Sequence, residues 1–127
     1  RHDGPFFPPT VLDGVGPGNA AFEREIFGPV MPVTRFATDD EAIALTNGTD
    51  YGLSAAIHTA DLNRGLALAN RLRTGMVHIN GMTIGDAPWV PMGGMGQSGN
   101  GGRYGGHWNL DEVTSWQWVT ARSVPRP

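Results

Sequence analysis

The sequence predicts an α/β fold built on parallel β-α-β units. Three observations lead to this prediction. Short apolar segments alternate with segments of helical periodicity between residues 30 and 80. Their order, strand–helix–strand–helix–strand, is typical of βαβ units. The length of 127 residues, with 39% hydrophobic and 17% charged residues, fits one small folded domain.

A strand and a capped helix are predicted in the first half of this pattern. Residues 1–18 are rich in proline and glycine, so we expect an irregular entry with at most a short edge strand. Val30–Phe36 is an apolar run with β-branched residues and predicts a strand. Thr38 stands three residues before Glu41, the spacing of a capping box, and the helix that it opens is expected to stop at Asn47-Gly48.

The second half of the pattern repeats this order. Leu53–Thr59 predicts a strand of small residues, and Asp61 is expected to cap the helix that follows it. Gly75 stands where a C′ residue would end that helix, and Met76–Asn80 predicts the next strand. Because these strands are continuously apolar, we expect them to be buried on both faces. The helical spacing of the middle segment rests on Leu62, Leu66, Ala69 and Leu72.

A glycine-rich stretch follows residue 80, within a long predicted loop. Gly94–Gly99 satisfies G-x-G-x-x-G, the spacing of dinucleotide-binding loops. However, no strand pattern precedes it, no helical pattern follows it, and Asp111 and Glu112 come too early to bind a ribose. We therefore interpret these glycines as turn-shaping residues.

The tail of the chain regains the period of a β-strand. Trp116 and Trp118 fall on one face of residues 114–121, between Thr114 and Thr120. Two tryptophans on one face of a terminal strand predict that the strand covers another surface, such as that of a second chain.

Composition excludes several function classes. The net charge is -3 and no basic run exists, so we expect no nucleic-acid partner. No apolar segment approaches the length of a membrane span and no leader pattern opens the chain, so we expect a cytoplasmic protein without membrane contact. Cysteine is absent, which removes any thiolate nucleophile or thiolate metal site. No metal site is expected from the four histidines either, because none has ligand spacing: His2, His58, His78 and His107.

The segment Glu23–Val30 leaves two interpretations open. A carboxylate on the turn Phe27-Gly28-Pro29 could accept hydrogen bonds from paired sugar hydroxyls, while the aromatic ring packs beside a flat ring. Alternatively, the acid lies on the surface and Phe27 belongs to the core.

The motifs together resemble a known family. "EIFGPV", the βαβα run, "GMVHIN", the loop "PMGGMGQSGNGGR" and a terminal strand follow one another as in the C-terminal part of the NAD(P)-dependent aldehyde dehydrogenases. "GGRYGG" and "NLDEVTSWQWVT" look most like the branch that acts on aromatic aldehydes such as benzaldehyde, vanillin or salicylaldehyde. The resemblance implies a catalytic-domain portion over residues 1–110 and an oligomerisation strand and tail over residues 111–127.

The resemblance also implies roles for particular residues. Glu25 matches the glutamate that binds the ribose next to nicotinamide, and Phe27 matches the aromatic residue that packs against the nicotinamide. The loop before the glycine stretch would border the aldehyde tunnel, with Trp89 and Met92 as wall residues. Ser115–Ala121 matches the strand through which subunits form a homo-oligomer.

Two positions depart from the family pattern. Most relatives have phenylalanine where Met92 stands, which implies a differently shaped tunnel. Many have lysine where Gly96 stands, so this loop is less charged.

The family mechanism needs groups that this chain lacks. A cysteine thiolate attacks the aldehyde, hydride passes to NAD or NADP, and a glutamate activates the water that releases the acid. We therefore expect this chain alone to be inactive and to need the remainder of an aldehyde dehydrogenase polypeptide. Two alternatives remain: a stand-alone oligomerisation or regulatory module, and a small nucleotide-binding domain that uses Gly94–Gly99.

Overall fold

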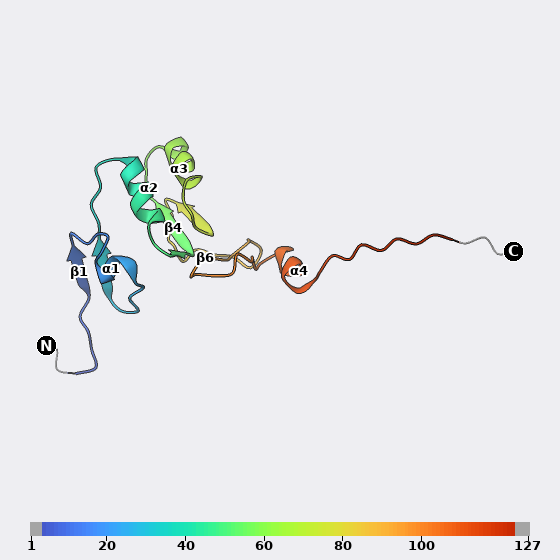
Figure 1. Ribbon diagram of the computed structural model, residues 1–127. Coiled ribbons are helices and arrows are strands. Elements are labelled where there is room, and N and C mark those ends of the chain that lie inside the picture. The colour runs from blue at the N-terminus through green and yellow to red at the C-terminus, as the bar shows by residue number, and fades with distance from the viewer. Residues whose placement is uncertain (1–3, 124–127) are drawn as a thin grey trace.

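The computed structural model describes residues 4–123 and contains short elements rather than one continuous sheet (Figure 1). Within these residues the strands form two-stranded sheets, in the pairs β1-β2, β3-β6 and β4-β5. The elements in chain order are β1 (Thr10–Asp13), α1 (Ala20–Glu23), β2 (Val30–Val33), α2 (Asp39–Asn47), β3 (Tyr51–Gly52), β4 (Ser54–Ile57), α3 (Leu62–Ala69), β5 (Met76–Ile79), β6 (Met95–Gly96) and α4 (Trp108–Val113). None of the helices in the described part of the chain is long and apolar enough to cross a membrane.

The unit β4-α3-β5 confirms the predicted parallel βαβ arrangement. β4 and β5 pair in parallel, from Ser54 opposite Met76 to Ile57 opposite Ile79. The Asp61 carboxylate accepts a hydrogen bond from the Arg64 N–H at 3.1 Å and so caps α3 as predicted. Gly65 lets the helix approach the sheet, because a Cβ there would lie 3.0 Å from Ile79 Cγ2.

The capping box of α2 is also confirmed. Thr38 Oγ1 accepts a hydrogen bond from the Glu41 N–H at 3.2 Å, and Glu41 Oε2 accepts one from the Ala37 N–H at 2.7 Å. The return bond therefore reaches the residue before the cap rather than the cap itself. Gly48 ends the helix as predicted, with its N–H donating to the Leu45 carbonyl.

The first strand of the predicted β-α-β-α-β order pairs differently from expectation. β2 pairs in parallel with β1, with Leu12 opposite Pro32, and no ladder joins it to β4 within residues 4–123. Pro32 has no N–H to donate, which limits how a strand containing it can pair. The run ends as a strand at Val33, so the predicted Val30–Phe36 strand is shortened.

Three further expectations are wrong for the described residues. The strands are not buried on both faces, because Val15, 5% exposed, is the one buried apolar side chain in residues 4–123. Gly75 is not the C′ residue of α3, since the helix ends at Ala69 with Asn70 as its C-cap. The segment after residue 80 is not entirely loop: β6 forms within it, and α4, which the sequence did not predict, follows.

The tail beyond α4 runs away from the rest of the molecule (Figure 1). Residues 114–123 form no ladder with the other described residues, and the side chains of Trp116 and Trp118 are 99% and 89% exposed. The strand predicted for Ser115–Ala121 therefore has no partner within residues 4–123, and residues 124–127 of the tail lie outside the described residues, as do residues 1–3.

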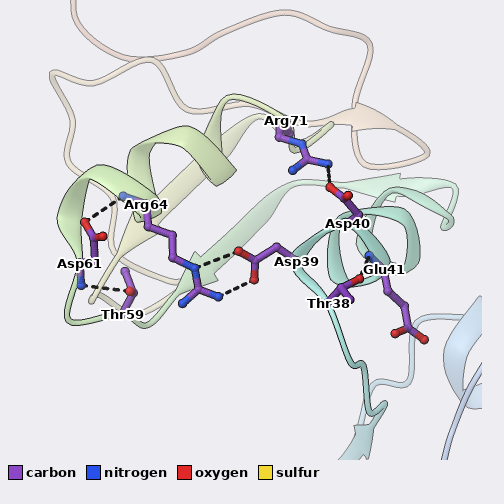
Figure 2. A network of polar contacts seen from close by, with 8 residues as sticks. All are labelled: Thr38, Asp39, Asp40, Glu41, Thr59, Asp61, Arg64 and Arg71. Carbon is purple, nitrogen blue, oxygen red and sulfur yellow. Dashed lines mark hydrogen bonds and ion pairs between the residues drawn. The ribbon is translucent and has the colours of Figure 1, made fainter.

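Ion pairs between side chains join α2 to Arg64 in α3 and to Arg71 just after α3 (Figure 2). The Arg64 guanidinium donates to both oxygens of Asp39, with Nε 2.9 Å from Oδ2. Arg71 Nη2 lies 2.6 Å from Asp40 Oδ1. The acids in the first turn of α2 complement the helix dipole, and two of them also pair with Arg64 and Arg71.

The pairing of Asp39 predicts an acid-sensitive contact. Hydrogen bonds from Arg64 hold the pKa of Asp39 below its ordinary value of 3.8. A lowered folded-state pKa means that the contribution is fully present above the unfolded-state pKa and is lost as the pH falls through the folded-state pKa. We therefore expect the stability difference between the wild type and Asp39→Asn, measured by urea unfolding, to shrink below about pH 4. A difference that stays constant from pH 6 to pH 3 would contradict this pairing.

Candidate functional site

Glu25 lies in an irregular turn between α1 and β2. The turn begins where Arg24 ends α1, with its N–H donating to the Ala20 carbonyl. The Glu25 side chain is exposed, and within residues 4–123 its carboxylate accepts no hydrogen bond. Glu25 borders an open cavity of about 600 Å³, which residues of α2, β3, β4 and the glycine stretch at Gln97 and Ser98 also line. The carboxylate is therefore available to an external donor.

Phe27 lies two residues further along the same turn. Its side chain is 93% exposed, and the Val30 N–H donates to the Gly28 carbonyl at 2.8 Å as β2 begins. Phe27 is therefore not part of any core formed by the described residues. Its ring is free to pack against another flat group or another part of a polypeptide.

Trp89 and Met92 lie together on the loop before the glycine stretch. Trp89 is 72% exposed and Met92 is 37% exposed. Met92 borders a smaller cavity of about 330 Å³ together with Asp86, Tyr104 and Asn109. Tyr104 belongs to the "GGRYGG" motif and Asn109 to "NLDEVTSWQWVT", but no pattern in the sequence connects either residue with Asp86. Glu25 and Met92 border different cavities.

The glycine stretch shows close backbone packing where the motif suggested a phosphate loop. A side chain on Gly94 would collide with Ser98, with Cβ 2.8 Å from the Ser98 Cβ. Gly96 has φ +59° and lies against the Asp50 carbonyl, a conformation and a close approach that favour glycine. The amides of Gln97 and Ser98 donate to the carbonyls of Asp50 and Met95. These donors are already used, which supports the turn-shaping interpretation.

The side chain of His78, in β5, has a buried polar atom that makes no hydrogen bond. Its Nε2 atom is buried without a partner, and so is the Oγ atom of Ser54 on the neighbouring strand. The register pairs Ser54 with Met76 and His78 with Ala56, so both polar side chains lie on the same face of the sheet. Within residues 4–123 no group of three His, Asp or Glu side chains could hold a metal ion, and His2 lies outside those residues.

Comparison with known proteins defines the class to which this fold and turn belong. The sequence profile of the aldehyde dehydrogenase family matches residues 1–119. The chain therefore belongs to the aldehyde dehydrogenase family.

Individual relatives act on aromatic aldehydes. Benzaldehyde dehydrogenase [NAD(+)] of Pseudomonas putida is 49% identical over 120 residues, which are 94% of this chain and 25% of the relative. Vanillin dehydrogenase of an Amycolatopsis species is 48% identical over 118 residues, which are 92% of this chain and 24% of the relative. The chain thus spans about a quarter of the length of the curated relatives that it matches.

A solved structure shows the same arrangement of the chain. Salicylaldehyde dehydrogenase from Pseudomonas putida G7, complexed with salicylaldehyde, superposes with a TM-score of 0.84 at 34% identity. The match covers 92% of this chain and 24% of that protein. The fold is therefore that of one part of an aldehyde dehydrogenase.

Proposed function

We propose that this chain is the C-terminal part of an NAD(P)-dependent enzyme that oxidises an aromatic aldehyde to the carboxylic acid. The observation that carries the proposal is the 49% identity to a benzaldehyde dehydrogenase, which extends over 94% of the chain. The name of that relative specifies NAD(+), which favours NAD as the cofactor here.

The large exposed surface supports the need for further polypeptide. A folded protein of 13.6 kDa has an accessible surface of about 6,600 Å². The surface of this chain is 10312 Å², and it includes exposed large apolar side chains such as Phe27, Trp89 and Trp116. Apolar surface on this scale marks contact with other protein. The remainder of an aldehyde dehydrogenase polypeptide is the partner that the family assignment favours.

The residues of the turn before β2 fit the nicotinamide end of the cofactor. A carboxylate can accept hydrogen bonds from both hydroxyls of a ribose, and the Glu25 carboxylate is exposed with no partner among the described residues. Phe27 offers an exposed ring on the same turn. Bound there, NAD(P) would supply the hydride acceptor, while Glu25 would hold the ribose and Phe27 would shield the nicotinamide from water.

The remaining roles divide the chain in two. Residues 1–110 form part of the catalytic domain, in which Trp89 and Met92 line the tunnel that admits the aldehyde. Residues 111–127 form the tail that joins subunits into a homo-oligomer through Ser115–Ala121. The support for the second role is the full exposure of Trp116 on an extended segment that pairs with nothing in residues 4–123.

The first experiment compares the pure 127-residue chain with a protein that carries the same sequence after a cysteine-containing catalytic segment. We expect benzaldehyde-dependent reduction of NAD⁺ by the longer protein and none by the short chain, because the short chain contains no cysteine. The absorbance of NADH measures both rates. Oxidation of benzaldehyde by the short chain would contradict the proposal, and so would an inactive longer protein that is folded.

A second candidate function is a stand-alone oligomerisation module, which the exposed Trp116 and Trp118 favour. This candidate predicts that the 127-residue chain forms a defined oligomer by itself. Trp116→Ser should then lower the mass of the assembly measured in solution. If light scattering shows that the wild-type chain is monomeric, this second candidate function is excluded.

A further inference from the structure

The loop that carries Trp89 has little regular structure, yet it is held at defined points. The N–H of Met92 donates to the Tyr104 carbonyl at 2.7 Å, and the N–H of Tyr104 donates to the Met92 carbonyl at 2.7 Å. The N–H of Gly106 donates to the Pro88 carbonyl at 2.9 Å. Three backbone hydrogen bonds thus join residues 88–92 to residues 104–106, on either side of Trp89.

Two glycines make this close approach possible. Gly105 has φ +110° and Gly106 has φ +52°, backbone conformations that other residues rarely adopt. A Cβ on Gly105 would overlap the Val90 carbonyl, and a Cβ on Gly106 would lie 2.9 Å from the Trp89 carbonyl oxygen. Both obstacles are backbone atoms, so a side chain at either position would displace the loop rather than rotate a neighbour.

A side chain from α4 holds the glycines in this position. Asn109 Oδ1 accepts a hydrogen bond from the Gly105 N–H at 2.8 Å. Asn109 also borders the cavity that contains Met92. Asn109 therefore connects α4 to Gly105, and the two glycines lie against the carbonyls of Val90 and Trp89.

We propose that Gly105, Gly106 and Asn109 are positioning residues that set the place of Trp89 and Met92, and through them the preference for a bulky aromatic aldehyde. This inference rests on the proposed function, in which Trp89 and Met92 form a wall of the aldehyde tunnel. A binding wall must be held within about 0.5 Å by supporting contacts to select one substrate over another. A small aldehyde does not fill the tunnel and is insensitive to the same displacement.

The test uses Gly105→Ala in the longer, active protein. We expect KM for benzaldehyde to rise about tenfold, while KM for acetaldehyde and KM for NAD⁺ change less than twofold, because the loss is confined to contacts of the ring. Gly101→Ala is the matched control. Gly101 also has a positive φ, +92°, but a Cβ there meets nothing within 4 Å.

If Gly105→Ala does not fold, a second pair of variants tests the positioning role. Asn109→Leu removes the acceptor for the Gly105 N–H and is expected to shift selectivity in the same direction, whereas Asn109→Asp keeps an acceptor and should retain the wild-type ratio of kcat/KM for the two aldehydes. Equal changes for benzaldehyde and acetaldehyde, or the same shift in Gly101→Ala, would overturn the positioning role alone. A folded wild-type protein that oxidises neither aldehyde would overturn the proposed function instead.

Discussion

Gly75→Ala is expected to destabilise the protein by about 3 kcal/mol or more, at the upper end of the usual cost of overpacking. A Cβ on Gly75 would overlap the carbonyl oxygen of Gly93, and it would lie 3.2 Å from the Gly94 Cα. These atoms belong to the backbone, so no change of rotamer can relieve the collision. The Gly75 N–H also donates to the Gly52 carbonyl at 3.0 Å, which fixes its position from the other side.

The measurement is urea unfolding of the protein that carries this sequence, with Gly16→Ala as the control. Gly16 has an ordinary φ and open space around its Cα, so alanine there should change the free energy of unfolding by less than about 1 kcal/mol. Equal stability of the two variants would show that Gly75 and Gly93 do not approach closely in solution.

The parts of the fold that could be predicted are those that local sequence determines. The caps at Thr38 and Asp61 depend on a side chain and an amide only three residues apart. The pairing of β4 with β5 follows from a short crossover through α3. Each of these features depends on contacts between neighbouring segments of the chain.

The parts that could not be predicted depend on distant contacts. Gly75 has the sequence context of a helix C-cap, yet it is a glycine because the loop at Gly93 crosses it from eighteen positions away. β6 consists of two residues, Met95 and Gly96, which are too few for a period-two pattern, and it pairs with the distant strand β3. The burial of strands was overestimated because apolar character indicates that a residue needs cover, not which polypeptide provides it.

The candidate site likewise contains features that the sequence predicts and features that depend on distant contacts. Spacing alone left Glu25 and Phe27 undecided, and the family resemblance selected their roles. The structure adds that Phe27 belongs to no core formed by residues 4–123 and that Glu25 borders an open cavity. The supporting residues Gly105 and Asn109 could not be identified from the sequence, since Gly105 contacts the backbone of a loop about fifteen residues earlier and Asn109 acts by accepting a hydrogen bond from Gly105.

Glu25→Gln is expected to weaken cofactor binding more than any other single change in the proposed site. Hydrogen bonds from ribose hydroxyls to a carboxylate contribute about 1.5–3 kcal/mol, because the acceptor is charged. Their loss corresponds to a rise of roughly 10- to 150-fold in KM for NAD⁺. KM for benzaldehyde should stay near the wild-type value, because Met92 of the proposed aldehyde wall borders a different cavity.

Glu23→Gln provides a control two residues away with identical chemistry. Glu23 Oε1 accepts a hydrogen bond from the Gly18 N–H at 2.8 Å, so this acid serves the local structure of α1. Its replacement should lower the midpoint of urea unfolding slightly and leave KM for NAD⁺ unchanged. If both variants raise KM for NAD⁺ equally, the cause is a disturbed turn, and Glu25 does not hold the ribose. If only Glu25→Gln raises KM for NAD⁺, the cofactor is the hydrogen-bonding partner of the Glu25 carboxylate.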